Sequence, residues 1–308
     1  MSMLSRVASK IYWMGRYVER AENTARLINV NTHLLLDLPK RVLLGWEPIV
    51  DITSSRDYFY SLYEEADERS VVRFMVTDTR NAGSILSTLN MVREDTRTIR
   101  DIIPREAWEQ TNELYLRAKT NAQSVLTQRH RYDYLRTIIL GAQTINGMLA
   151  GTMIHDEGYD FLRIGRNLER ADMTTRIIDV RSATLLPEMS EDLTPFENLQ
   201  WMSVLKSLTA YQMYRRKMRL RIRRPDVLKF LLLEETFPRA FNHALRQVNG
   251  CLKNLPHNEK PFKLLTELQK KLLLAKPHEL DQEGLHGFID ELQLNLIKIN
   301  DSIHESYF

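Results

Sequence analysis

Apolar residues recur along much of this chain at the three- and four-residue spacing of amphipathic helices. The clearest stripe lies on one side of a helix over residues 11–28 and consists of Ile11, Met14, Val18, Ala21, Ala25 and Ile28. A second stripe of the same form lies over residues 161–178 and consists of Phe161, Ile164, Leu168, Ala171, Thr175 and Ile178. Few stretches alternate with the period of two that is typical of strands, and none has a hairpin dipeptide between strand-like runs. The pattern predicts an all-α protein with about ten helices.

The two stripes belong to one sequence motif that occurs twice. GRYVERAENTARLINV, at residues 15–30, returns 150 positions later as GRNLERADMTTRIIDV, at residues 165–180. A self-match of this length predicts an internal duplication, with one helical repeat over residues 1–155 and a second over residues 156–308. Each repeat carries one Glu-Arg motif. We expect the two repeats to superpose and to pack against each other through or near the two motif helices.

The segments between and after the motif copies also show helical periodicity. Further helices are predicted over residues 46–63, 84–103, 108–126 and 132–153. In the last of these, Gly147 and Gly151 are four residues apart on one face, a spacing that favours close approach of a neighbouring helix. The second half follows the same order, and Trp201 stands 155 positions after Trp46. A duplication with a five-residue insertion explains this offset.

Charged residues cover the side of each motif helix that lies opposite the apolar stripe. In the first copy they are Arg16, Glu19, Glu22 and Arg26, with Arg20 on the flank. In the second copy they are Arg166, Glu169, Asp172 and Arg176, with Arg170 on the flank. Freely solvated positions have little reason to carry the same charges in both copies. We therefore expect this charged face to meet something specific.

Two interpretations of the charged face are open. In the structural one, the motif helices pack around a pseudo-two-fold axis, so that Glu19 pairs with Arg170 or Arg176. Glu169 then pairs with Arg20 or Arg26, and the buried network fixes the register of the helices. In the functional interpretation, arginines outnumber the acids and the spare guanidinium groups grip a carboxylate or phosphate in bidentate fashion. All ten charged residues of the two motifs are then candidate ligand-binding residues.

The sequence resembles the bacterial alpha-E family, an all-helical domain named for its Glu-Arg motif. The similarity starts at MLSRVASKIYWMGRYVERAENTARL, continues through SILSTLNMVREDTRTIRD and FLRIGRNLERAD, and reaches FPRAF before the last helices. It covers nearly the whole chain. The chain departs from the family pattern at Ala240, where the pattern has Ser, and at Gly83, near which it has Pro.

This resemblance implies a biochemical context. Members of the family are typically encoded beside, or fused to, circularly permuted ATP-grasp proteins, and they accompany transglutaminase-like and proteasome-like hydrolases. Such systems are associated with forming and hydrolysing amide or peptide bonds. The resemblance thus implies an accessory component of an ATP-grasp-linked amide or peptide ligation system, with the ATP-grasp protein as its partner.

Two function classes follow for the charged face. In the first, the protein is a binding module that holds a ligase partner, an anionic small molecule or an acidic peptide substrate. In the second, it is itself an enzyme of amide or acyl chemistry, in which Glu19 or Glu169 is the acid or base and neighbouring arginines hold the substrate. A carboxylate among arginines has a depressed pKa and is a poor general base near neutral pH, which favours binding. No nucleophile with its base is recognisable, so no catalytic residue is assigned.

A basic run, RRKMRLRIRR at residues 215–224, is a second candidate site, because seven of its ten residues are basic. Such a run binds phosphate or an acidic partner, and the residues expected to do so are Arg215, Arg216, Arg219 and Arg221. The alternative is a solvated helix end that Pro225 terminates. A nucleic-acid binder is a weaker alternative, since no zinc-finger or RNP signature accompanies the run.

Composition narrows the remaining classes. With 43% apolar and 27% charged residues in 308, the chain has the profile of an ordinary globular protein, and its net charge of +3 does not indicate nucleic acid. Cys251 is the single cysteine and excludes an intrachain disulfide. The only Glu-x-x-His, from Glu283 to His286, lacks the partners of a di-iron site, and no phosphate-binding Gly loop occurs. We expect no metal, no cofactor and no membrane span, and a cytoplasmic location, because the first residues lack the apolar core of a signal peptide.

Overall fold

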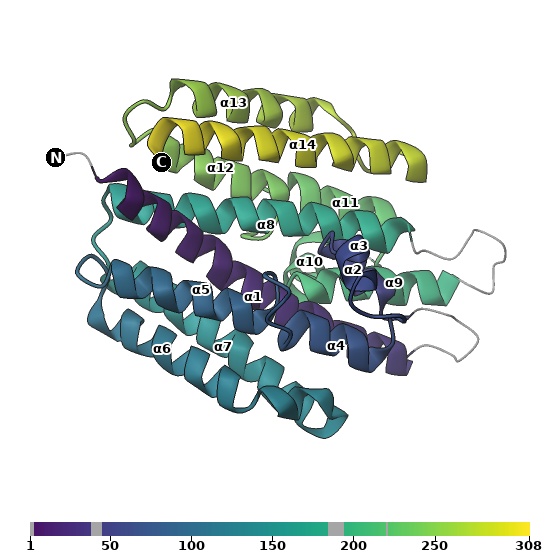
Figure 1. Ribbon diagram of the computed structural model, residues 1–308. Helices are drawn as coiled ribbons and strands as arrows, with labels where there is room; N and C mark the ends of the chain where they lie inside the picture. The colour runs from purple at the N-terminus through teal and green to yellow at the C-terminus, as the bar shows by residue number, and fades with distance from the viewer. Residues whose placement is uncertain (1–2, 38–44, 184–193, 220) are drawn as a thin grey trace.

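The part of the chain that the computed structural model describes, residues 3–37, 45–183, 194–219 and 221–308, contains helices and no strands, which confirms the all-α prediction (Figure 1). The helices up to the middle of the chain are α1 (Ser5–Asp37), α2 (Glu47–Ile52), α3 (Arg56–Tyr60), α4 (Glu68–Val76), α5 (Ile85–Thr98), α6 (Arg105–Thr120), the 3-10 helix η1 (Ala122–Leu126) and α7 (Gln128–Thr152). They are followed by α8 (Glu157–Ala183), α9 (Thr194–Ser207), α10 (Tyr211–Met218), α11 (Arg224–Leu233), α12 (Phe241–Leu252), α13 (Glu259–Leu274) and α14 (Gln282–Tyr307).

The described residues form 14 α-helices, so the predicted number of about ten was too low. The helix expected over residues 46–63 is broken into α2 and α3. Between them the hydroxyl of Thr53 donates to the carbonyl groups of Ile49 and Val50, and Ser54 takes a left-handed conformation with φ of 52°. Hydroxyl side chains compete in this way with the helix for backbone hydrogen bonds. The periodicity of the apolar residues does not register such a break.

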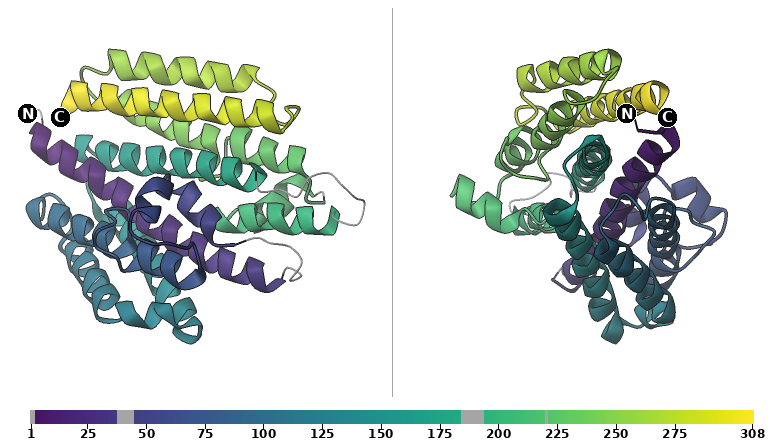
Figure 2. Two further views of the ribbon diagram at one scale, coloured as in Figure 1. Left: turned by 45° about the vertical axis from the view of Figure 1, so that its right-hand side comes forward. Right: turned by 90° about the vertical axis from the view of Figure 1, so that its left-hand side faces the viewer.

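The two motif helices, α1 and α8, lie at the centre of the molecule and share its most extensive helix–helix interface. Helices α5 and α7 pack on α1, and α6 packs on both of them. Helices α12 and α14 pack on α8, and α13 packs on both. Figure 2 shows the first group, in blue, on one side of the central pair and the second, in green to yellow, on the other. The central position of the motif helices is as predicted, whereas the duplication itself stays a prediction.

Two glycines allow α1 and α8 to approach this closely. A β-carbon at Gly15 would lie 2.4 Å from the carbonyl oxygen of Leu162, and one at Gly165 would lie 2.1 Å from that of Tyr12. Both contacts are with backbone, which cannot move aside as a side chain can. Only glycine therefore fits at these two positions.

The close approach predicted at Gly147 and Gly151 was wrong. A β-carbon at either position would meet nothing within 4 Å, and both residues are exposed on α7. Spacing alone identifies small residues on one helix face, but a close approach also needs a second helix over that face.

The apolar stripes of both motif helices are buried, as expected from their periodicity. On the charged faces of α1 and α8, Glu19, Glu22 and Glu169 are buried, whereas the motif arginines are partly exposed. None of the described helices, α1 with its 33 residues included, has the continuous apolar stretch that crossing a membrane requires.

Candidate functional site: the Glu-Arg faces of α1 and α8

Glu169 of α8 is held by two arginines of α1. Arg16 donates from Nε to its Oε2 over 2.8 Å. Arg20 binds it in bidentate fashion, from Nε to Oε1 over 2.6 Å and from Nη2 to Oε2 over 3.0 Å. Arg16 continues the network by donating from Nη1 to Asn300 Oδ1 of α14 over 2.8 Å. The Glu169 side chain is 2% exposed, so this is a buried ion pair and not a surface contact.

Glu19 of α1 makes the reciprocal contact with α8. Its carboxylate lies 3.0 Å from Nε of Arg170 and 2.6 Å from Nη1 of Arg239, and its side chain is fully buried. Arg239 stands just before α12 and reaches α1 at two further places. It donates to Glu22 Oε1 over 2.9 Å and to Asn23 Oδ1 over 2.6 Å. The loop before α12 is therefore fastened to α1 by one guanidinium group.

The structural interpretation correctly predicted two of these partners, the pairs Glu19–Arg170 and Glu169–Arg20. The alternative partners, Arg26 and Arg176, bind one turn back on their own helices. Arg26 donates to Glu22 over 2.6 Å, and Arg176 donates to Asp172 over 2.8 Å. The i, i+4 geometry keeps these two arginines from the opposite helix. The ligand-binding role of the charged residues stays a prediction.

Two carboxylates of the network, Glu169 and Glu22, are held in the ionised state. Burial alone would raise the pKa of Glu169, but the charges and hydrogen bonds of Arg20 and Arg16 outweigh it and lower the pKa to about 2. Burial likewise opposes ionisation of Glu22, and Arg239 and Arg26 lower its pKa. A carboxylate with such a pKa accepts protons poorly at neutral pH. The electrostatics of Glu169 and Glu22 thus disfavour a general base on this face.

The depressed pKa of Glu169 predicts an acid-sensitive fold. Because the folded-state pKa of about 2 lies below the ordinary value of 4.5, the ionised form stabilises the fold at neutral pH. This contribution, on the order of 3 kcal/mol, is lost as the pH falls from about 5 to about 2. We expect the difference in unfolding free energy between wild type and Glu169→Gln to be largest at pH 7 and to shrink over that range, measured by urea unfolding. A difference that stays constant with pH would contradict the assignment, and Glu113→Gln, in an exposed pair with Arg117, is the control.

Several residues of the network were missed in the sequence. Arg239 lies in a loop, in the FPRAF segment, and loops carry no periodic signal. Tyr12 and Asn300 are ordinary helix residues in sequence, but the Tyr12 hydroxyl and the Asn300 side-chain oxygen both accept from Arg16. The available signal for Arg239 was its place in FPRAF, one of the segments that carry the family resemblance.

Arg166 is the one motif arginine that makes no ion pair with a described residue. Its Nε is buried without a hydrogen-bond partner. Glu169 pairs with Arg16 of the opposite motif helix. At Glu19 the corresponding position is filled by Arg239 and not by Arg166. Burial, together with the charges of Arg239 and Arg166, lowers the pKa of Arg170. Positive charge is thus in excess on this flank.

A cavity of about 190 Å³ lies on the opposite flank, beside Glu169. It brings together four predicted site residues, Arg20, Glu169, Asp172 and Arg176. The other lining residues come from both motif helices, α4 and two loops that the sequence did not single out: Thr24, Met173, Met75, Thr53, Ser55, Asn81 and Gly83. The remaining predicted residues, Arg16, Glu19, Glu22, Arg26, Arg166 and Arg170, do not line it.

The cavity walls offer both donors and acceptors. Arg20 uses Nε and Nη2 on Glu169, and no described residue accepts from its Nη1. Arg176 uses Nε on Asp172 and Nη1 on Ser54, which leaves Nη2 without a described acceptor. On Asp172, Oδ2 accepts from Arg176 and no described side chain donates to Oδ1. The site can therefore hold a group that accepts from guanidinium and donates to carboxylate.

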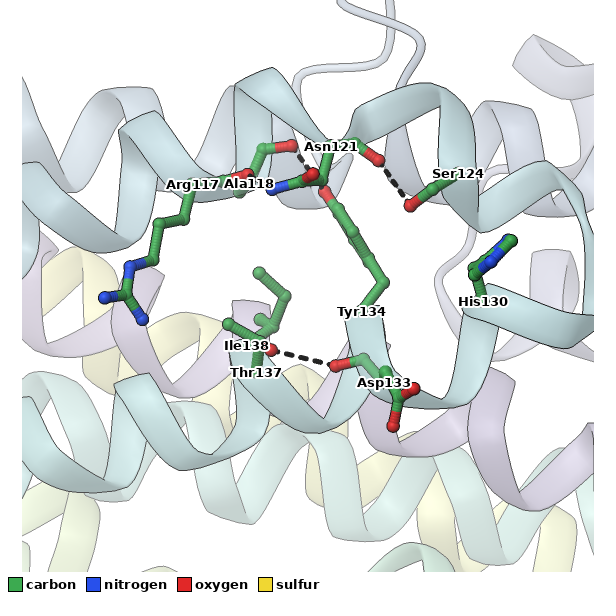
Figure 3. A pocket seen from close by; sticks show the side chains of 9 residues that line it. All are labelled: Arg117, Ala118, Asn121, Ser124, His130, Asp133, Tyr134, Thr137 and Ile138. Carbon is green, nitrogen blue, oxygen red and sulfur yellow. Dashed lines mark hydrogen bonds between the residues drawn. The ribbon is translucent and has the colours of Figure 1, made fainter.

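A larger cavity, of about 460 Å³, lies between α6, η1 and α7, away from the motif helices (Figure 3). Three of its polar side chains are bonded to nearby backbone: Asn121 donates to the carbonyl of Arg117, Tyr134 to that of Ala118 and Thr137 to that of Asp133. Groups bonded in this way are not available to a ligand. Size alone therefore does not make this cavity the better candidate.

The basic run forms the end of α10 and the segment before α11. Its four predicted partner-binding residues, Arg215, Arg216, Arg219 and Arg221, are all exposed. Helix α10 ends at Met218, and the next residue, Arg219, takes a left-handed conformation with φ of 53°. Arg224 instead donates to the carbonyl groups of Leu280 and Asp281 and so ties the segment to the start of α14. Binding of phosphate or an acidic partner by this run stays a prediction.

One group of potential metal ligands occurs among the described residues, at Asp179, His286 and Asp290. His286 Nδ1 lies 2.7 Å from Asp179 Oδ1, and this contact raises the pKa of His286. Nε2 of the same ring lies 3.6 Å from Asp290 Oδ2. The imidazole thus stands between two carboxylates as an exposed ion-pair partner. Glu283 of the Glu-x-x-His sequence is not part of the group.

Comparison with known proteins gives the chain a family context. The model of the Alpha-E family, described as a predicted alpha-helical domain with a conserved ER motif, matches residues 3–308. An uncharacterized protein of Mycobacterium bovis is 23% identical over 321 residues, which cover 97% of this chain and 36% of that protein. Two uncharacterized proteins of Mycobacterium tuberculosis match with the same identity and coverage. The chain therefore spans little more than a third of the length of these curated relatives. No solved structure matches it.

Proposed function

Because the chain belongs to the Alpha-E family, we propose that it is an accessory helical component of an ATP-grasp-linked amide or peptide ligation system. In this role it binds a circularly permuted ATP-grasp ligase or the anionic or peptide substrate of that ligase. The observation that carries the proposal is the cavity beside Glu169, where Arg20 and Arg176 have N–H groups to spare.

The buried network supports binding over catalysis. Glu169 orients Arg20 through a bidentate contact, so the guanidinium group is already placed when a ligand arrives. Such preorganisation lowers the entropy lost on binding. The same contact lowers the pKa of Glu169, which leaves this carboxylate poorly suited to proton transfer.

The length of the relatives supports a partner. Nearly two thirds of the Mycobacterium bovis protein lies outside the region that this chain matches. A helical domain that is joined to a further segment in one protein is well suited to act with a separate partner in another. The association of the family with ATP-grasp proteins identifies the partner that we propose.

We also infer an internal duplication, with repeats over residues 1–155 and 156–308. The offset of 150 residues relates the two close glycines, Gly15 and Gly165, and also the carbonyl groups they meet, on Tyr12 and Leu162. The same offset separates Asn31 from Arg181, which donates to it over 2.8 Å across the interface. These pairs support a two-fold relation between the halves, so that each Glu-Arg face has a counterpart.

Reconstitution with the ATP-grasp protein tests the proposed function. We expect the two proteins to elute as one complex in size-exclusion chromatography, and an amide-linked product to form only with both proteins and ATP, detected by mass spectrometry. Replacing Arg20 and Arg176 together with alanine is expected to lower the product yield by about tenfold or more, the usual effect of losing charged hydrogen bonds. Arg105→Ala, in an exposed pair with Glu109, is the matched control.

Two outcomes would overturn the proposal. If no complex forms and the product yield does not depend on this chain, it is not a component of the ligation system. If the purified chain alone forms or cleaves amide bonds, the enzyme interpretation replaces the accessory one.

A further inference from the structure

Gly83 and Arg239 occupy matching places in the fold. Each stands one residue before the N-cap of a helix, Ser84 for α5 and Ala240 for α12. Helix α5 packs on the motif helix α1, and α12 packs on the motif helix α8. The loop that contains Arg239 is fixed to α8 by Thr174, which donates to the Arg239 carbonyl over 2.9 Å. Thr24, 150 positions earlier, lines the cavity next to Gly83.

Gly83 and Arg239 differ in the side chain that each presents to the opposite motif helix. The Arg239 side chain crosses to α1 and fills the space beside Glu19, Glu22 and Asn23. The residues 150 positions later on α8 are Glu169, Asp172 and Met173, and all three line the cavity. Gly83 has no side chain that could reach Glu169, Asp172 and Met173. The cavity is thus the space that an arginine fills on the other flank.

We propose that this cavity binds a free amino acid, with its carboxylate on Arg20 and Arg176 and its ammonium group on Asp172. The inference rests on the proposed function, in which this face takes a ligand, and it names the ligand class. A volume of about 190 Å³ is smaller than the roughly 300–1,000 Å³ of pockets for drug-sized ligands. It suits a ligand of amino-acid size.

The walls present both a positive charge and a carboxylate oxygen to a ligand. Glu19 needs Arg239 as a second arginine, but Glu169 already pairs with two, Arg16 and Arg20. A ligand in the cavity therefore does not have to supply a cation for Glu169. Three arginines, Arg16, Arg20 and Arg176, face two carboxylates here, which leaves one positive charge for a carboxylate to meet. Oδ1 of Asp172 can accept the hydrogen bond of an adjacent ammonium group. An amino acid supplies both groups on neighbouring atoms.

Gly83→Arg tests the inference by filling the cavity from within the chain. Gly83 does not have a positive φ, and a β-carbon there would lie 3.2 Å from the side-chain oxygen of Asn81, which needs to move only slightly. We expect wild-type protein to bind amino acids, tested with glycine, alanine and glutamate by titration calorimetry. Gly83→Arg should abolish the binding while the protein keeps its melting temperature. Gly83→Ala, which adds the β-carbon alone, should keep most of the affinity.

Single-group probes test the ligand class. Acetate offers only the carboxylate and ethylguanidinium only a cation, so each is expected to bind at least about tenfold more weakly than the best amino acid. Asp172→Asn should weaken amino acids about tenfold without weakening acetate, because the charge it removes also pairs with Arg176. Binding of ethylguanidinium without amino acids would overturn the assignment, as would absence of amino-acid binding or binding that survives Gly83→Arg. Complex formation with the ATP-grasp protein is measured separately. The proposed function can therefore fail while amino-acid binding holds, and amino-acid binding can fail while the complex forms.

Discussion

Glu19→Gln is expected to lower the free energy of unfolding by about 3–5 kcal/mol, the usual cost of removing one partner from a buried ion pair. The substitution keeps the shape of the side chain but removes the charge that faces Arg170 and Arg239. Arg239 is buried and the Arg170 side chain is only 16% exposed, so both would lose part of the negative charge that compensates them. At about 2–4 °C per kcal/mol for domains of 150–250 residues, the melting temperature should fall by about 10 °C. Thermal unfolding followed by circular dichroism measures the change.

Glu113→Gln is the matched control for this prediction. Glu113 pairs with Arg117 one turn away, and both side chains are at least half exposed. Removing such a pair is expected to cost about 0.3–0.5 kcal/mol. A loss at Glu19 no larger than that at Glu113 would mean that the buried network does not stabilise the fold.

Arg170→Ala distinguishes a structural from a ligand-binding role on the same flank. Glu19 would keep Arg239, and the repulsion of Arg170 by Arg239 and Arg166 would be relieved. We therefore expect Arg170→Ala to cost clearly less stability than Glu19→Gln. If both substitutions unfold the protein equally, the network is purely structural on this flank, and Arg170 has no share in ligand binding.

The central features of the fold could be predicted from the sequence because they depend on local periodicity. The apolar stripe from Ile11 to Ile28 implies a helix with one buried side, and its recurrence implies a second helix of the same kind. Opposite charges at matching positions then suggested the pairs Glu19–Arg170 and Glu169–Arg20. These inferences needed only the position of the apolar face on each helix and the sign of each charge on the opposite face.

The rest depends on long-range geometry that periodicity does not contain. Arg239 contacts Glu19 across 220 positions, from a loop whose path follows from the packing of α12 on α8. The cavity is formed by Gly83 in a similar loop, and it exists because a side chain is missing there. Neither a loop contact nor an unfilled space has a sequence signature of its own.

Gly15 and Gly165 are the two glycines at which α1 and α8 approach each other most closely, and the sequence did not predict this role. Gly165→Ala is expected to destabilise the fold by about 3 kcal/mol, the upper part of the range for overpacked cores. The added carbon would lie 2.1 Å from the carbonyl oxygen of Tyr12 and 3.0 Å from its carbonyl carbon, so the two helices must separate. Separation would also lengthen the contact of Arg16 and Arg20 with Glu169. Urea unfolding measures the loss.

Gly147→Ala makes the same chemical change where no second helix is near. A β-carbon at Gly147 would meet nothing within 4 Å, and alanine is favoured over glycine within an exposed helix by about 1 kcal/mol. The two substitutions should therefore act in opposite directions, with Gly147→Ala raising the stability and Gly165→Ala lowering it. If Gly165→Ala leaves stability unchanged or raises it, α1 and α8 do not approach as closely as described. The geometry of the ion-pair network between them would then lose its support, because Glu19 and Glu169 reach the opposite helix only at this separation.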